Sequence, residues 1–328
     1  MNISIDSAAT FYPESLISAD ELAKMAGIST EEVLKKGVNS IHAAEKGTLT
    51  TDMAVKAVNE AIGDIDPKSI DQLAFISEGV SDYLYMDPSK NILKKIGGRI
   101  EDLIYSSDYF RGNNGTVGII RTVGNQLRGN PQISRSVIAT SLIWSYHSDN
   151  RRLGDAFLGD GAGALMLTEG GERNKILSIA LKSLSEYNMI SGFRYGGTLN
   201  EIDQEIARTH KFIYEILDKE HYNGMIEHIS EAGKETANNA LKKAGLTSSD
   251  ISYIGICGFN KKINDEIVSD FGCSNVIDPL SDRGYLGSLG VIDVISSFVN
   301  DNTVRSGDKI LIIAVGIDAN VEAMVIEK

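Results

Sequence analysis

The side chains that could act as nucleophiles or bases are few in this chain. It has two cysteines, Cys257 and Cys273, and five histidines. Cys257 ends an apolar run, where a free cysteine is often simply buried. A nucleophilic thiol needs a base or a positive neighbour that activates it, and no such group is evident beside Cys257 in the sequence. A core thiol and a relocated nucleophile both stay open. Two cysteines make no disulfide framework, and we expect no metal site.

A glycine-rich segment, LGDGAGALML (158–167), is a second candidate for chemistry. A dinucleotide-binding fingerprint requires a strand, a glycine-rich turn and then a helix. Here the glycines lead into an apolar run typical of a strand. The segment therefore predicts a tight turn that enters a strand, with small residues permitting close approach of the backbone.

The composition is that of an ordinary globular protein. The chain has 328 residues, of which 42% are hydrophobic and 23% charged, with a formal net charge of -13. No apolar run is long enough to span a membrane, and the N-terminus lacks the pattern of a signal peptide, so we expect a cytoplasmic protein. The net negative charge argues against nucleic acid as the main partner.

An acidic ligand or carrier would need a local basic patch on so negative a chain. Four basic doublets could supply one, although each could equally be a solvated surface pair. They are Lys35-Lys36, Arg151-Arg152, Lys242-Lys243 and Lys261-Lys262.

An internal repeat is the most informative feature of the organisation. Residues 51–78 predict an amphipathic helix, a turn and an apolar strand, with Met53, Val55, Val58 and Ile62 at helical spacing. Residues 234–258 repeat that order. There the helix face consists of Ala237, Ala240, Leu241 and Ala244, Gly245 ends the helix, and Tyr253 to Cys257 form the strand.

The two halves also end alike, each with a central apolar strand and a second strand reached through small residues. The pairs are 136–143 with 161–170, and 309–316 with 319–328. Apolar runs of this kind suit strands buried on both faces of a layered α/β fold. We expect an N-terminal half, 1–170, and a C-terminal half, 171–328. An insertion at about 185–230 is either a lid or tunnel wall, or a surface excursion without function.

These segments resemble the β-ketoacyl-ACP synthase III family of the thiolase superfamily, in the family's order and over nearly the whole chain. FLGDGAGALML matches its FGDGAGA signature, and Arg152 lies where the family has an arginine. The other matching segments are KKGVNSIH (35–42), LTTDMAVKAVNEAI (49–62), SDISYIGICGFNKKI (249–263), IDPLSDRGYLGSLGVIDVISSFV (277–299) and SGDKILIIAVGIDANVEAMVIE (306–327). The resemblance implies a thiolase-like α/β fold, with two duplicated halves in α-β-α-β-α layers, and a dimer.

The family condenses an acyl group with malonyl-ACP, using a cysteine at a helix N-terminus with a histidine and an asparagine. This sequence departs at all three positions. Asn113, in RGNNGTVGIIRTVGNQL (111–127), matches the cysteine, or Phe110 does in another register. Cys257 matches the histidine and Tyr285 the asparagine. None of the five histidines falls at a matching position: His42, His147, His210, His221 and His228.

The remaining site residues also rest on the resemblance. Asn113 either fills space or mimics a loaded acyl group, and Tyr285 is a filler or a hydrogen-bond donor. Asn260 retains an asparagine of the family motif. Lys35 and Arg152 lie near positions that bind coenzyme A or carrier phosphates in the family, although they could be plain surface charges. We expect no cofactor, with thioesters of coenzyme A or phosphopantetheine as possible substrates.

Three hypotheses follow for fatty-acid or polyketide-type biosynthesis. The first is a catalytically silent subunit, as a homodimer or a heterodimer with an active ketosynthase. The second is an acyltransferase with altered chemistry that uses Cys257 or an unidentified group. The third is a non-catalytic protein that binds acyl-CoA or an acyl carrier protein. The loss of the nucleophile favours the first, because such a loss typically costs several orders of magnitude in rate.

Overall fold

The structure is a computed structural model that describes residues 2–98, 105–110, 114–209 and 212–328. The predicted Asn113, and His210 with it, lie outside the described residues. The helices are α1 (Ala19–Ala26), α2 (Thr30–Lys35), α3 (Thr50–Ile62), α4 (Pro88–Ile96), α5 (Thr116–Gly129), α6 (Gln204–Thr209), α7 (Lys219–Ala244), α8 (Lys261–Val268), α9 (Leu280–Arg283) and α10 (Ser288–Asn300).

Ten strands of the described chain form one mixed sheet, in the order β14-β13-β15-β16-β10-β1-β9-β6-β4-β5. They are β1 (Ile3–Phe11), β4 (Gln72–Ser77), β5 (Tyr105–Phe110), β6 (Arg135–Leu142), β9 (Gly161–Glu169), β10 (Lys175–Ser183), β13 (Tyr253–Cys257), β14 (Val276–Ile277), β15 (Lys309–Val315) and β16 (Asn320–Glu327). Three short ribbons pair β2 (Leu16–Ser18) with β3 (Ser40–His42), β7 (Arg152–Leu153) with β8 (Ala156–Phe157), and β11 (Ser191–Phe193) with β12 (Tyr214–Ile216).

The strand order is the same in the two halves of the sheet. From the edge inward, β5-β4-β6-β9-β1 on one side corresponds to β14-β13-β15-β16-β10 on the other. The two series meet only where Ser4 of β1 pairs with Lys175 of β10. A duplicated chain predicts this arrangement, and the division of the chain at 170 and 171 stays a prediction.

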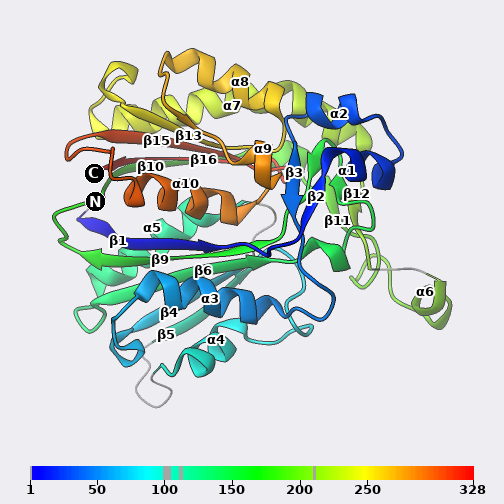
Figure 1. The fold of residues 1–328 in the computed structure, drawn as a ribbon, viewed down its shortest axis with the longest axis horizontal. Coiled ribbons are helices and arrows are strands. Elements are labelled where there is room, and N and C mark those ends of the chain that lie inside the picture. The colour runs from blue at the N-terminus through cyan, green and yellow to red at the C-terminus, as the bar shows by residue number, and fades with distance from the viewer. Residues whose placement is uncertain (1, 99–104, 111–113, 210–211) are drawn as a thin grey trace.

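The helices form layers around the two halves of the sheet (Figure 1). Helix α3 packs on β1, β6 and β9, and α7 packs on β10, β15 and β16 at the opposite face. Helices α5 and α10 lie between the halves and contact strands of both. This is the predicted α-β-α-β-α layering. It buries the starts of α5 and α10 at the centre of the molecule.

The repeated helix–turn–strand units have the predicted form, with one difference. Helix α3 buries Met53, Val58 and Ile62, and the second strand spans Tyr253–Cys257 as expected. The second helix is much longer than the repeat alone predicts, because α7 already begins at Lys219. The polar stretch up to residue 230 therefore belongs to the helix that covers the second half of the sheet. The excursion from the fold is shorter than predicted and ends just before α7.

Candidate functional site

The glycine-rich turn has a structural role. Asp160 is fully buried, and its two carboxylate oxygens accept hydrogen bonds from Nη1 and Nη2 of Arg151, at 2.6 and 3.0 Å. It also accepts the backbone N–H groups of Trp144 and Ala44. The turn then enters β9 rather than a helix, which is not the geometry of a dinucleotide site. Within the described residues, no group of acidic, histidine or cysteine side chains could hold a metal ion.

The centre of the molecule lies where α5 and α10 begin. Thr116, the first residue of α5, donates its hydroxyl hydrogen bond to the carbonyl oxygen of Ser288, the first residue of α10, at 2.6 Å. Both residues are fully buried. The free N–H groups of two helix starts therefore meet in one interior region, which favours negative charge.

A carboxylate from β16 closes the start of α5. Glu322 accepts the backbone N–H groups of Val117 and Gly118, at 3.0 and 3.2 Å. The N-cap residue of α5, Gly115, has no side chain that could do this. Glu322 is only 3% exposed, although it lies in an otherwise apolar strand. The helix start is thus occupied by a negative group of the chain itself.

A second carboxylate closes the start of α10. Glu78 follows β4, is 1% exposed and accepts the backbone N–H of Ser288. Burial raises the pKa of Glu78 to about 8, the negative charges of Asp318 and Glu322 add to the rise, and hydrogen bonds from Ser288 partly oppose it. This carboxyl group therefore carries a proton around neutral pH.

The two closures are reciprocal. Glu78 belongs to the first half of the chain and meets a helix of the second half, whereas Glu322 belongs to the second half and meets a helix of the first. The same interior holds Asn114, which is 3% exposed and whose side-chain amide has no partner among the described residues. We call Glu78, Glu322 and the two helix starts the reciprocal clasp.

Sequence reasoning did not identify Glu78 or Glu322. A signal was nevertheless present for Glu322, since a single acidic residue interrupts the apolar run VEAMVI of the closing strand. A charge at such a position is rarely buried without a partner. For Glu78 the signal was weaker, because the residue directly follows a strand and could equally begin a solvated loop.

Cys257 is placed as a core thiol. It ends β13 and is 7% exposed, and it packs so close to α10 that a side-chain carbon on Gly290 would lie 3.3 Å from its Cβ. Burial raises the pKa of the thiol well above its usual range, and the charges of Asp278 and Asp293 raise it further. The thiol is therefore protonated at neutral pH, which favours the core interpretation over the nucleophilic one.

Tyr285 lies beside the clasp. It is 3% exposed, and its hydroxyl oxygen accepts the backbone N–H of Ile317 at 3.4 Å. Burial raises its pKa strongly, with Glu78 and Asp318 adding to the effect. Phe110, the other register for the nucleophile position, ends the edge strand β5 and is exposed, six residues before α5 begins. Its place in a strand argues against that register.

Two of the predicted binding residues, Arg152 and Asn260, lie near Asp155. Asn260 caps α8 and donates its side-chain amide to Asp155 at 3.4 Å, and Lys36 pairs with the same carboxylate at 2.5 Å. Arg152 lies in the adjoining β7–β8 ribbon and donates to the carbonyl of Gly154 at 2.8 Å. Lys35 is an exposed residue in the last turn of α2.

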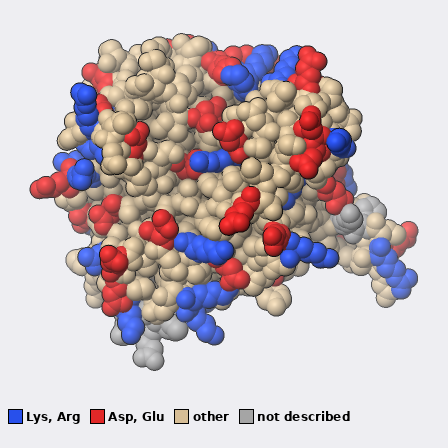
Figure 2. Space-filling model, in the orientation of Figure 1, with Lys and Arg blue, Asp and Glu red and all other residues tan. Residues whose placement is uncertain are grey.

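A cleft of about 400 Å³ opens beside this group. Its walls include Leu34, Gly37, Lys261 and Leu280. Lysine and arginine side chains alternate with aspartate and glutamate over the face of the molecule in Figure 2, so this face carries no continuous basic surface.

The chain is similar in sequence to 3-oxoacyl-[acyl-carrier-protein] synthase III proteins. The family model of the C-terminal part of 3-oxoacyl-[acyl-carrier-protein] synthase III matches residues 241–328. The β-ketoacyl-[acyl-carrier-protein] synthase III of Microcystis aeruginosa is 24% identical over 307 residues, which cover 90% of this chain and 88% of that protein.

Solved structures show the same fold. The 3-oxoacyl-[acyl-carrier-protein] synthase III of Aquifex aeolicus VF5 aligns with a TM-score of 0.81 at 15% identity, over 99% of this chain and all of that one. A variant of OleA from Xanthomonas campestris, with lauric acid and lauroyl-CoA bound, aligns with a TM-score of 0.81 at 17% identity, over 100% and 99% of the two chains. The chain is therefore similar in sequence to 3-oxoacyl-[acyl-carrier-protein] synthase III, and it has the same fold.

Proposed function

We propose that the chain is a non-condensing subunit of a fatty-acid or polyketide-type pathway in the cytoplasm, and that it assembles with an active ketosynthase. The observation that carries the proposal is the carboxylate of Glu322 on the start of α5. By the resemblance to the family, we expect Asn113 at the nucleophile position just before this helix, and a carboxamide cannot form a thioester.

The physical argument concerns charge. Acyl transfer and decarboxylation both pass through an oxyanion, which needs hydrogen-bond donors aimed at it. At the start of α5, two N–H groups that could serve as donors are used by Glu322, and the carboxylate would repel a developing anion. At the start of α10, the N–H of Ser288 is used by Glu78, whose protonated carboxyl group occupies the donor without adding a negative charge. Both helix starts therefore lack the free donors that an oxyanion needs.

A candidate surface for the partner synthase lies at the end of the sheet. Strand β5 is an edge strand, whose backbone groups on the outer side have no sheet partner among the described residues. Its Phe110 is 71% exposed, and Tyr83, Leu84 and Tyr85 of the loop after β4 are also exposed. An exposed apolar side chain such as Phe110 on an open sheet edge is typical of an interaction site. We propose that a homologous chain, as homodimer or heterodimer, covers this edge.

The test has two arms. Intact-protein mass spectrometry after incubation with a panel of acyl-CoAs is expected to show no acyl adduct on the wild type, and a small adduct on Asn113→Cys. Sedimentation with an active ketosynthase III is expected to show a complex that Phe110→Glu weakens and Leu16→Glu, an exposed apolar residue elsewhere, leaves unchanged. A stable acyl adduct on the wild type would refute the silent subunit, and loss of complex with Leu16→Glu would refute the surface.

A second candidate is favoured by one observation. The carboxyl group of Glu78, with a pKa of about 8, is poised to exchange a proton near neutral pH, as general acids and bases do. An acyltransferase with altered chemistry would then act on thioesters of coenzyme A or phosphopantetheine held near Asn260, Lys35 and Arg152. Turnover of an acyl-CoA that Glu78→Gln abolishes would select this candidate over the silent subunit.

A further inference from the structure

An arm of the molecule carries a cavity that belongs to neither the clasp nor the edge strand. Strands β11 and β12 form a ribbon that packs against the side of the body, and α6 stands clear of the body at the right of Figure 1. The cavity between these three elements has a volume of about 380 Å³. That is within the range of small-molecule sites, roughly 300–1,000 Å³.

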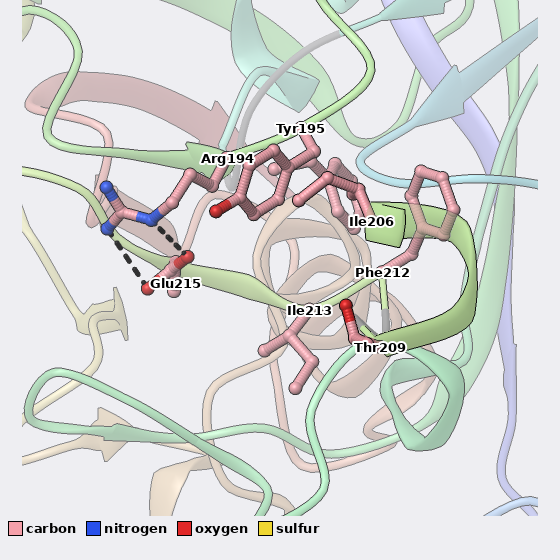
Figure 3. A pocket seen from close by; sticks show the side chains of 8 residues that line it. Arg194, Tyr195, Ile206, Thr209, Phe212, Ile213 and Glu215 are labelled. Carbon is pink, nitrogen blue, oxygen red and sulfur yellow. Dashed lines mark hydrogen bonds and ion pairs between the residues drawn. The ribbon is translucent and has the colours of Figure 1, made fainter. Parts of the chain in front are cut away.

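The walls of the cavity are apolar and aromatic. Phe193 and Tyr195 come from the β11 side, Ile206 from α6, and Phe212 and Ile213 from the β12 side. Figure 3 shows Tyr195 and Ile206 between Phe212 at one end and an ion pair at the other. Walls of this kind accept an apolar chain and gain free energy by removing it from water.

The polar end of the cavity indicates what the chain would carry. Arg194 donates its Nε and Nη2 to the two carboxylate oxygens of Glu215, at 2.8 and 3.2 Å. A carboxylate ligand drawn to Arg194 would also meet the negative charge of Glu215. An uncharged amide or hydroxyl group, which both donates and accepts, suits both members of the pair.

We propose that this cavity binds a small molecule made of an apolar chain with an uncharged, hydrogen-bonding end. The proposal goes beyond the silent subunit and does not depend on it, because the cavity is formed entirely by the arm. The volume of the cavity suits a small molecule.

The chain contains its own reporter of binding. Trp144, the one tryptophan in the sequence, is buried, and its ring lies 5.7 Å from that of Tyr214. The Tyr214 ring lies 5.2 Å from Phe193, which lines the cavity. A ligand against Phe193 should therefore change the fluorescence of Trp144 through two ring contacts.

The experiment titrates the full chain with octanamide and with octanoate, followed by Trp144 fluorescence and calorimetry. We expect saturable binding of octanamide, at least about tenfold tighter than that of octanoate. Absence of saturation with octanamide, or equal or tighter binding of octanoate, would overturn the proposal.

Three variants on the arm sharpen the result. Ile206→Glu puts a charge in the wall and should weaken octanamide at least about tenfold, whereas Leu199→Glu, at an exposed position of the same arm, should leave it within about twofold. Glu215→Gln should raise the affinity for octanoate several-fold. Equal losses in Ile206→Glu and Leu199→Glu, or no change for octanoate in Glu215→Gln, would contradict the assignment. A change of oligomeric mass in Leu199→Glu without ligand binding would show that a second copy covers the arm instead.

Discussion

The starts of α5 and α10 occupy equivalent places in the two halves, and both take a carboxylate from the opposite half. They differ in how the carboxylate is held. Glu322 uses both of its oxygens on backbone N–H groups, whereas Glu78 uses one oxygen on the N–H of Ser288. Burial outweighs the hydrogen bonds from Ser288 at Glu78, and the pKa of this carboxyl group rises to about 8. Glu322 therefore resembles a helix cap, whereas Glu78 is a carboxyl group that holds a proton.

The largest effect should come from Gly287, beside the second of these helix starts. Its φ of 51° with ψ of -128° suits glycine alone, and a side-chain carbon there would overlap the Glu78 carboxylate. Gly287→Ala should cost about 4 kcal/mol of unfolding free energy, from backbone strain and overpacking together. When Glu78 is also replaced by alanine, the loss of unfolding free energy caused by Gly287→Ala should be smaller. Urea denaturation of the wild type, the two single variants and the double variant measures this coupling. An unchanged cost would mean that Glu78 does not press on this position.

Glu322→Ala should cost somewhat less, about 3 kcal/mol, because it leaves two buried N–H groups without an acceptor. Urea denaturation at pH 7 measures the loss. Glu169→Ala, at an exposed position of β9, is the matched control and should change stability by less than about 0.5 kcal/mol. A loss as small as that of the control would remove Glu322 from the account.

The dependence of stability on pH should reveal the protonated state of Glu78. The pKa of Glu78 is raised in the folded state, so its contribution is present below about 4.5 and is lost as the pH rises towards about 8. Between pH 6 and pH 8 the wild type should lose about 2 kcal/mol more than Glu78→Gln, whose side chain does not titrate. Asp278 and Asp293 also have raised pKa values, but the wild type and Glu78→Gln both contain them, so their effect cancels in the comparison. Parallel curves for the two proteins would contradict the protonated state of Glu78.

The smallest effect concerns Cys257, whose side chain packs against Gly290 of α10. Cys257→Ala should cost about 1 kcal/mol through the small cavity that it leaves. In the folded wild type, Cys257 should react with a thiol reagent far more slowly than Cys273, which is half-buried. Mass spectrometry of the labelled peptides measures both rates. Fast labelling of Cys257 would revive its role as a nucleophile.

Much of the fold could be predicted because it follows local rules. Helical spacing in α3, the apolar run of β13 and the small residues at the turn into β9 each determine their own element. The length of α7 could not be predicted, because its first turns are polar and Tyr222 there packs on the β7–β8 ribbon, which is far away in the sequence. For the chemistry of the site, the sequence yields only the expectation of a loss, which rests on the resemblance, at the positions of Asn113, Cys257 and Tyr285.

The carboxyl groups at the starts of α5 and α10 could not be predicted from the chain. Glu78 and Ser288 are 210 positions apart, and Glu322 is 205 positions from Val117. Such contacts exist only once both halves have folded and stacked. A sequence shows that a charge is present in a strand, and the partner that makes its burial tolerable is visible only in three dimensions.

The most direct test of the central claim is a condensation assay with the purified chain alone. Acyl-CoA and malonyl-ACP are supplied together, and the 3-ketoacyl product is measured by mass spectrometry. The account predicts no product above the reaction without protein, because two carboxylates close the helix starts and no thiolate is available. Robust product formation by the wild type, lost in Cys257→Ala or in Glu78→Gln, would contradict it.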